Sequence, residues 1–300
     1  MKKIQSFLEK HMIIVYVITL ALYIVFSKVP SVLAGIFSLD RENIVVYNLL
    51  QAVYLILYSI LLFIIIKKCK FTKEAPRKNL FLCVLIGFPF LIDSIGYLLK
   101  LSMLPQTFYR VSGLGILSVV ISNIAVGIEE EVQFRGLILP LMMRKYENKK
   151  HPYIKAVLFS SALFGITHLL VTLIIKTLVG ETLTAIEWQS YIYQSFYATC
   201  GGVVFAAMTL YHNSLAPAII WHSIVDICSR LYEGITIDSV YDIYVRPYDW
   251  VDVLHLNKIF PWQVGEIKVI AIIMYLVMLA YGIFLIYKLE KSAQAKLEES

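Results

Sequence analysis

The sequence predicts an all-α protein, a polytopic transmembrane helical bundle of about eight helices. Hydrophobic residues make up 59% of the 300 residues and charged residues only 16%, whereas soluble domains carry roughly a quarter charged residues. The mean hydropathy of the chain is +0.74. Its apolar residues also form repeated runs of about 20 residues, the length that a helix needs to cross a bilayer. These observations favour lipid as the solvent over a soluble domain with a large core.

Each predicted span is an apolar run bounded by polar or charged residues, and no internal repeat relates the runs. The first run is long enough to span and has no small-residue cleavage site after it, so we expect a retained helix rather than a signal peptide. We treat residues 1–300 as one integral membrane domain. The predicted spans are 11–29, 44–66, 79–100, 112–141, 152–178, 190–211, 214–234 and 266–287.

Charged residues alternate in sign between successive connections, and this predicts the orientation. Because basic connections stay in the cytoplasm, both termini are expected to be cytoplasmic. The same placement explains the net charge of +6 without a nucleic-acid partner. The basic residues are Lys67, Lys68, Lys70, Lys73, Arg77 and Lys78 after the second span, and Arg144, Lys145, Lys149 and Lys150 after the fourth; acidic residues are Glu181 and Glu187 after the fifth, and Asp238, Asp242, Asp249 and Asp252 after the seventh.

The connection after the seventh span is about 30 residues long and rich in aromatic residues. Such residues are typical of a membrane interface, and a lid that faces the substrate is the alternative interpretation. The aromatic residues are Tyr241, Tyr244, Tyr248, Trp250 and Trp262.

The fourth span contains Glu129, Glu130, Glu131 and Arg135 within an apolar run. A charge near the bilayer centre costs on the order of 3 kcal/mol, so such residues face a protein interior or a water-filled cavity. Glu131 and Arg135 are four residues apart and can form an ion pair on one helix face. Glu130 is rotated by about 100° from Glu131, which leaves it free to act as a general base. Glu129 is expected on a third face, near the rim; placement of the glutamates in cytoplasmic water is the alternative.

Two further spans place histidines deep in apolar sequence. His168 lies in the fifth span, with Phe164 one turn earlier, and His222 and Asp226 share a helix face in the seventh. A structural His–Asp contact between helices is one interpretation. The other is a second pole of an active site, either a pair of metal ligands or donors to an oxyanion, with Asp226 orienting His222.

Other hydrolytic signatures are missing from the sequence. It has no HExxH zinc motif and no GxSxG nucleophile elbow. The chemistry-bearing residues are therefore Glu130, His168, His222 and Asp226, with Glu131, Arg135 and Phe164 as structural support. Together they supply a base for water and an electrophilic stabiliser, which hydrolysis inside a bilayer needs.

These motifs resemble those of the CPBP family, the CAAX prenyl endopeptidases and bacteriocin-processing or immunity proteins, also called Abi. The family's EExxxR, FxxxH and HxxxN/D motifs correspond in order to Glu130–Arg135, Phe164–His168 and His222–Asp226. The resemblance covers about residues 110–230, the expected catalytic core. It implies an intramembrane endopeptidase that acts on a membrane-associated peptide or protein, in peptide maturation, signalling or bacteriocin immunity, in a bacterial cell membrane.

The resemblance also implies roles for the residues. Glu130 and His168 would activate water, and His222 with Asp226 would form or support an oxyanion site. Asp226 stands where the members that process prenylated proteins favour Asn. Zinc is a possible cofactor, with Glu130, His168, His222 and Asp226 as its ligands; a water activated without a metal is the alternative.

Two other functions stay open from the sequence. The same fold can act as a non-catalytic immunity or binding protein that shields the cell from a peptide toxin. Buried carboxylates and histidines also occur in proton-coupled transporters, which predict inverted repeats or matching broken helices.

Overall fold

The computed structural model describes residues 7–8, 10–36, 44–68, 79–102, 109–111, 113–178, 180–231, 235–237, 263–264 and 267–298. Its helices are α2 (Met12–Ile36), α3 (Ile44–Lys68), α4 (Leu80–Leu85), α5 (Pro89–Ser102), α6 (Gly113–Glu131), the π-helix η3 (Val132–Ile138), α7 (Leu139–Tyr146), α8 (Pro152–Leu178), α9 (Ala185–His212), α10 (Ala216–Arg230) and α13 (Val269–Glu298). Short strands form two antiparallel pairs, β1 (Tyr109–Val111) with β2 (Ile235–Ile237) and β3 (Gln263–Val264) with β4 (Ile267–Lys268).

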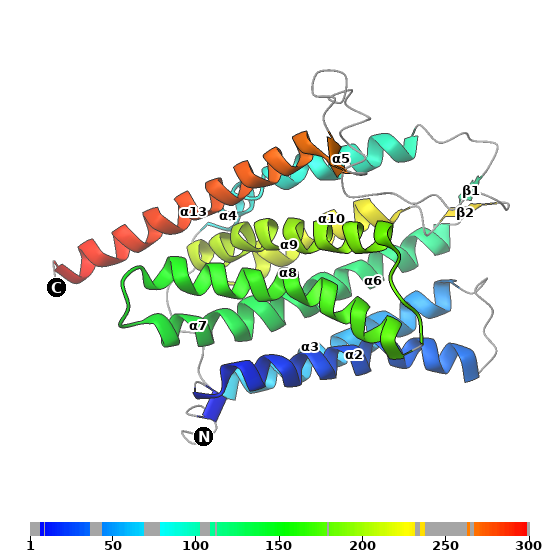
Figure 1. The fold of residues 1–300 in the computed structure, drawn as a ribbon, viewed down its shortest axis with the longest axis horizontal. Coiled ribbons are helices and arrows are strands. Elements are labelled where there is room, and N and C mark those ends of the chain that lie inside the picture. The colour runs from blue at the N-terminus through cyan, green and yellow to red at the C-terminus, as the bar shows by residue number, and fades with distance from the viewer. Residues whose placement is uncertain are drawn as a thin grey trace.

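The helices run back and forth along one axis and form a bundle (Figure 1). Among the described residues, five helical stretches are long and apolar enough to cross a membrane: 12–30, 45–67, 113–146, 152–178 and 269–295. These spans confirm an integral, multi-pass membrane protein. The other predicted spans are also helical, but α10 is only 15 residues long and the span predicted at 79–100 is divided. The count of eight crossings therefore stays a prediction.

The prediction of one continuous helix over 79–100 is wrong, because the structure divides it into α4 and α5. Pro89 has no backbone N–H to donate, and its ring clashes with the carbonyl four residues earlier in a regular helix. The backbone N–H groups of Gly87 and Phe88 instead donate to the carbonyls of Val84 and Leu85, at 2.9 and 3.2 Å. The polypeptide thus makes one tight turn between the two helices.

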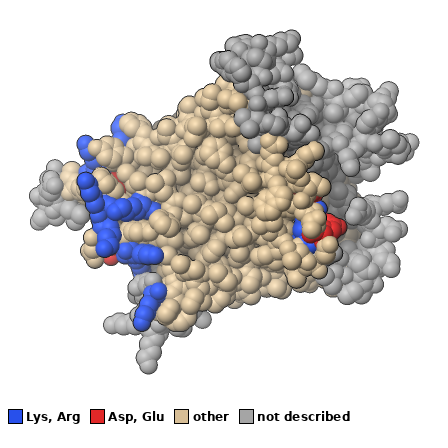
Figure 2. All heavy atoms as spheres, in the orientation of Figure 1, with Lys and Arg blue, Asp and Glu red and all other residues tan. Residues whose placement is uncertain are grey.

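Basic side chains gather at one end of the bundle (Figure 2), the end where α2 begins and α13 ends (Figure 1). The connection between α7 and α8, which carries Lys149 and Lys150, lies at this end, as does the last turn of α3 with Lys67. The cytoplasmic orientation of both termini stays a prediction. The charged residues predicted between 70 and 78, and the acidic and aromatic residues predicted between 238 and 262, lie outside the described residues.

The opposite end carries an ion-pair cluster where α8 turns into α9. Lys176 Nζ lies 3.0 Å from Glu181 and 2.9 Å from Glu187. Thr184 and Glu187 also form a capping box, in which each side chain accepts a hydrogen bond from the other residue's backbone N–H. The hydrogen bond from Lys176, helped by those from the Thr184 backbone and hydroxyl, lowers the pKa of Glu187 from 4.5 to about 2.

This cluster predicts a pH-dependent contribution to stability. Since the pKa of Glu187 is depressed on folding, its contribution is complete above the unfolded pKa of 4.5 and is lost as the pH falls toward 2. The difference in Tm between the wild type and Glu187→Gln, measured in detergent, should therefore shrink from pH 7 to about pH 3. A difference that stays constant over this range would contradict the assignment.

Candidate active site

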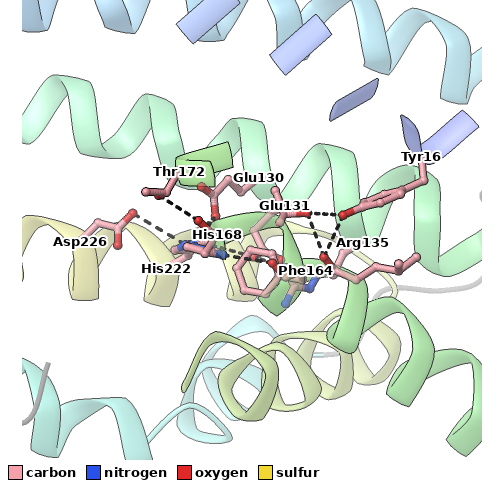
Figure 3. Close-up of polar contacts among 11 residues, drawn as sticks. Tyr16, Glu130, Glu131, Arg135, Phe164, His168, Thr172, His222 and Asp226 are labelled. Atoms are coloured by element: carbon pink, nitrogen blue, oxygen red, sulfur yellow. Dashed lines mark hydrogen bonds and ion pairs between the residues drawn. The ribbon is translucent and has the colours of Figure 1, made fainter. Parts of the chain in front are cut away.

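Three helices bring the predicted residues to one place in the bundle. Glu130 comes from the last turn of α6, His168 from the middle of α8, and His222 and Asp226 from α10. Their side chains turn toward one another in Figure 3. The side chains of Glu130 and His222 are 13% and 7% exposed, and those of His168 and Asp226 are 20% and 23% exposed, so the cluster lies mostly inside the protein.

Glu130 faces the Nε2 atoms of both histidines. Its Oε2 atom lies 4.0 Å from His168 Nε2 and 3.4 Å from His222 Nε2. Neither separation is a good hydrogen bond, and Glu130 Oε2 has no hydrogen-bond partner among the described residues. At separations of this size a single water can bridge two polar groups. The geometry thus offers one small polar site among three side chains.

The hydrogen bond of His168 fixes which ring nitrogen carries the proton. Its Nδ1 atom lies 3.0 Å from the carbonyl oxygen of Phe164, and a carbonyl can only accept a hydrogen bond. Nδ1 must therefore donate, so neutral His168 has its lone pair on Nε2, the nitrogen that faces Glu130. Phe164 also packs edge-on against the His168 ring, with centroids 5.0 Å apart. Phe164 thus supports His168 through both its backbone and its side chain.

His222 is oriented by Glu131. Its Nδ1 atom lies 2.8 Å from Glu131 Oε1, and its ring stacks on Phe205 with centroids 4.9 Å apart. Asp226 Oδ2 lies 3.7 Å from the other ring nitrogen, Nε2, so an orienting role for Asp226 stays a prediction. Asp226 lies one helical turn after His222 on α10, whereas Glu131 approaches the ring from α6.

Arg135 neutralises Glu131, as the i,i+4 spacing predicts. Its Nη1 atom lies 3.0 Å from Glu131 Oε1, and both side chains are buried. Nη2 donates to the carbonyl of Gly202 at 3.2 Å, and the guanidinium lies over the Phe164 ring at 4.3 Å. A Cβ at Gly202 would lie 3.0 Å from Nη2, so the glycine permits this close approach. Arg135 therefore joins α6, α8 and α9 around the site.

Glu129 lies away from the rim, and both alternatives predicted for it are wrong. The residue is fully buried, and its two carboxylate oxygens have no hydrogen-bond partner among the described residues. Glu131 is also fully buried. The glutamates therefore lie in the protein interior rather than in cytoplasmic water, and Glu129 is set apart from Glu130 because it follows a different face of α6.

The residues that were proposed as zinc ligands do not form a metal site in this geometry. No group of three or more His, Cys, Asp or Glu side chains in the described ranges is arranged to hold a metal ion. His168 Nε2 and His222 Nε2 lie 4.0 and 3.4 Å from the same oxygen, Glu130 Oε2. Whether the hydrolase is of the glutamate type or the metal-dependent type stays a prediction.

Phe205 and Gly202 contact the site but were not predicted from the sequence. Both lie in α9, whose predicted span carries no charged or histidine residue near them. A phenylalanine and a glycine in an apolar helix look like ordinary packing residues, because only the tertiary contacts distinguish them.

Comparison with known proteins agrees with the motif pattern. Residues 112–228 match the profile of the type II CAAX prenyl endopeptidase Rce1-like family, a segment that holds Glu130, His168, His222 and Asp226 and is close to the predicted core of 110–230. The comparisons with curated proteins and with solved structures find no match. Residues 112–228 therefore form an Rce1-like domain of the CPBP family within a multi-pass membrane protein.

Proposed function

We propose that this protein is an intramembrane endopeptidase that hydrolyses a peptide bond by means of a water molecule activated by Glu130 and His168. The observation that carries the proposal is the position of Glu130 Oε2, within 4.0 Å of His168 Nε2 and 3.4 Å of His222 Nε2. A general base has to reach its proton directly or through one water, and this spacing satisfies that requirement.

The first step is attack by water on the peptide carbonyl. The water is held between the Glu130 carboxylate and the lone pair on His168 Nε2, which the Phe164 carbonyl keeps unprotonated by engaging Nδ1–H. Glu130 removes one proton as the water oxygen bonds to the carbonyl carbon, and the carbonyl oxygen becomes an oxyanion. General-base assistance of this kind contributes about 10²–10⁴-fold.

The second step is stabilisation of the oxyanion by His222. Its Nδ1–H donates a hydrogen bond to Glu131. Its Nε2 faces the carboxylates of Glu130 and Asp226, which can only accept hydrogen bonds, so we assign a proton to Nε2 as well. That N–H donates to the oxyanion when the substrate enters. A fixed donor in a dry site contributes more than it does in water, because nothing has to reorganise during the reaction.

The third step is collapse of the tetrahedral intermediate. The C–N bond breaks, and the proton held by Glu130 passes to the leaving amine. The new carboxyl group and the free amine depart, and Glu130 is again ionised. One carboxylate therefore serves first as base and then as acid, so the mechanism balances without a second proton donor.

The substrate class follows from the setting of the site. A peptidase site built on α6, α8 and α10 of a membrane bundle accepts chains that reach it from the bilayer, so the substrate is a membrane-associated peptide or protein. The family description names CAAX prenyl endopeptidases. A farnesylated peptide that ends in a CAAX sequence is therefore the first probe that we would use.

The test uses the full chain, purified in liposomes, with the farnesylated peptide and the same peptide without its lipid. The proposal expects a released C-terminal fragment, detected by mass spectrometry, that is absent with Glu130→Gln. If cleavage of every peptide offered is equal for the wild type and Glu130→Gln, the proposal fails and a non-catalytic immunity or binding function takes its place.

Asp226 supplies a further prediction within this mechanism. Its carboxylate lies 3.7 Å from His222 Nε2, and an asparagine of the same shape keeps an acceptor there and adds a donor for the oxyanion. Asp226→Asn should therefore retain kcat within about tenfold. Asp226→Ala removes the acceptor beside His222 Nε2–H and leaves this donor less well positioned, so it should lower kcat by about 10²-fold. Equal kcat values for the two variants would contradict a polar role for Asp226.

A further inference from the structure

The turn between α4 and α5 contacts the residue that precedes His222. Trp221 Nε1 donates a hydrogen bond of 2.6 Å to the carbonyl oxygen of Val84, at the point where Pro89 interrupts the helix. The Trp221 side chain is largely buried, with 8% of the residue exposed. Non-helical backbone in a membrane protein is tolerated where protein covers it, and here the indole of Trp221 does so.

Gly87 makes room for that indole. A Cβ added at Gly87 would overlap the Cδ1 and Nε1 atoms of Trp221, so any larger residue has to displace the ring. The conformation of Gly87 itself is unstrained, since it is not among the residues with positive φ. The requirement for glycine therefore comes from the close approach of the Trp221 ring to the backbone.

A second contact reaches His222 from the same turn. Phe90, in the first turn of α5, stacks on Phe205 with centroids 4.5 Å apart and an interplanar angle of 15°. Phe205 stacks in turn on the His222 ring, at 4.9 Å and 14°. Phe90 also lies 6.2 Å from the Trp221 ring centroid. Three nearly parallel rings thus run from α5 through α9 to the histidine on α10.

We propose that the α4–α5 turn positions His222, with Trp221 acting through the backbone of α10 and Phe90 acting through the Phe205 ring. Both are positioning residues and neither touches the reacting atoms. The turn lies outside residues 112–228, so this assigns a role in the active site to a part of the chain that the family profile does not cover. The inference rests on the proposed function, in which His222 Nε2 stabilises the oxyanion.

The expected kinetic effect is on kcat rather than on KM. A displaced indole moves the second turn of α10, and with it His222, relative to Glu130 and Glu131. A shift of about 1 Å in a catalytic group can cost about 10²-fold in rate even when the mutated residue is remote. Loss of an interaction that is made only in the transition state lowers kcat and leaves KM unchanged.

The experiment is a double-mutant cycle between Gly87→Ala and Trp221→Ala, with Trp221→Phe as a third variant and with kcat and KM measured on the farnesylated CAAX peptide in liposomes and expressed per folded enzyme. Gly113→Ala is the matched control, because a Cβ at Gly113 meets nothing within 4 Å. Gly87→Ala should lower kcat by about 10–100-fold at unchanged KM, and Gly113→Ala should leave both constants unchanged. In the Trp221→Ala background, which removes the ring atoms that a Cβ at Gly87 would overlap, Gly87→Ala should cost less than about threefold, since interacting sites are non-additive.

Trp221→Phe keeps an aromatic ring but cannot donate a hydrogen bond to Val84. It is a sufficient test of the inference if Gly87→Ala does not accumulate as folded protein. It should lower kcat at unchanged KM. Additive effects in the cycle, a wild-type kcat for Trp221→Phe, or effects on KM alone would overturn the inference. Glu130→Gln in the same assay separates this outcome from failure of the proposed function: an inactive Glu130→Gln beside fully active turn variants overturns only the positioning role.

Discussion

Glu130→Gln is expected to lower kcat for peptide hydrolysis by about 10²–10⁴-fold, the range for loss of a general base. The amide has the shape of the carboxylate but cannot take a proton from water. Since Glu130 Oε2 has no direct hydrogen bond among the described residues, the substitution should leave the Tm and the amount of folded protein unchanged. The measurement is kcat on the farnesylated peptide, together with Tm in detergent.

Glu129→Gln is the matched control for this prediction. Glu129 is the preceding residue of α6 and is more deeply buried, but it lies outside the cluster of Glu130, His168 and His222. It should retain wild-type kcat. An active Glu130→Gln, or an equal loss in both variants, would contradict the assignment of Glu130 as the base.

Arg135→Met is expected to destabilise the protein strongly, by about 3–5 kcal/mol, the cost of leaving a buried charge without its partner. The side chain has a similar length but removes the ion pair to Glu131 and the hydrogen bond to the Gly202 carbonyl. His222 would lose its fixed acceptor as Glu131 relaxes. The measurement is the free energy of unfolding in mixed micelles, with Tm as a second readout.

Two further variants distinguish the destabilisation caused by an unpaired buried charge from that caused by a general loss of packing. Arg135→Met combined with Glu131→Gln should be more stable than Arg135→Met alone, because the uncompensated carboxylate is removed. Lys149→Met, at an exposed position, should change stability by less than about 1 kcal/mol. If Arg135→Met were as stable as Lys149→Met, the proposed role of Arg135 in stabilising the buried Glu131 would be wrong.

The positions of helices and the pairing within a helix were predictable from the sequence. Apolar runs of bilayer length predicted helices that the structure contains, and the 3.6-residue turn predicted both the pairing of Glu131 with Arg135 and the separate direction of Glu130. These features depend on the geometry within a single helix, which can be worked out from the sequence of that helix alone.

Contacts between helices were less predictable. The spacing of His222 and Asp226 on α10 suggested that they orient each other, whereas Glu131 on α6 makes the 2.8 Å contact to the ring. Glu129 is buried because of how α6 is rotated relative to the other helices. The periodicity of residues within α6 does not predict that rotation. Pro89 explains the break in 79–100, which we did not predict. The need for glycine at position 87 appears only when α4 and α10 are packed together, because the Trp221 ring then lies against it.

The most direct test of the central claim compares membrane and secreted peptides from cells that carry the wild type or Glu130→Gln at matched expression, by mass spectrometry. Hydrolysis by the Glu130 site predicts a peptide that accumulates uncut in the variant and whose cut form appears only with the wild type. That result also identifies the substrate and its cleavage position. Matching peptide profiles, together with a variant that keeps the wild-type phenotype, would contradict catalysis by Glu130 and leave binding or immunity as the function.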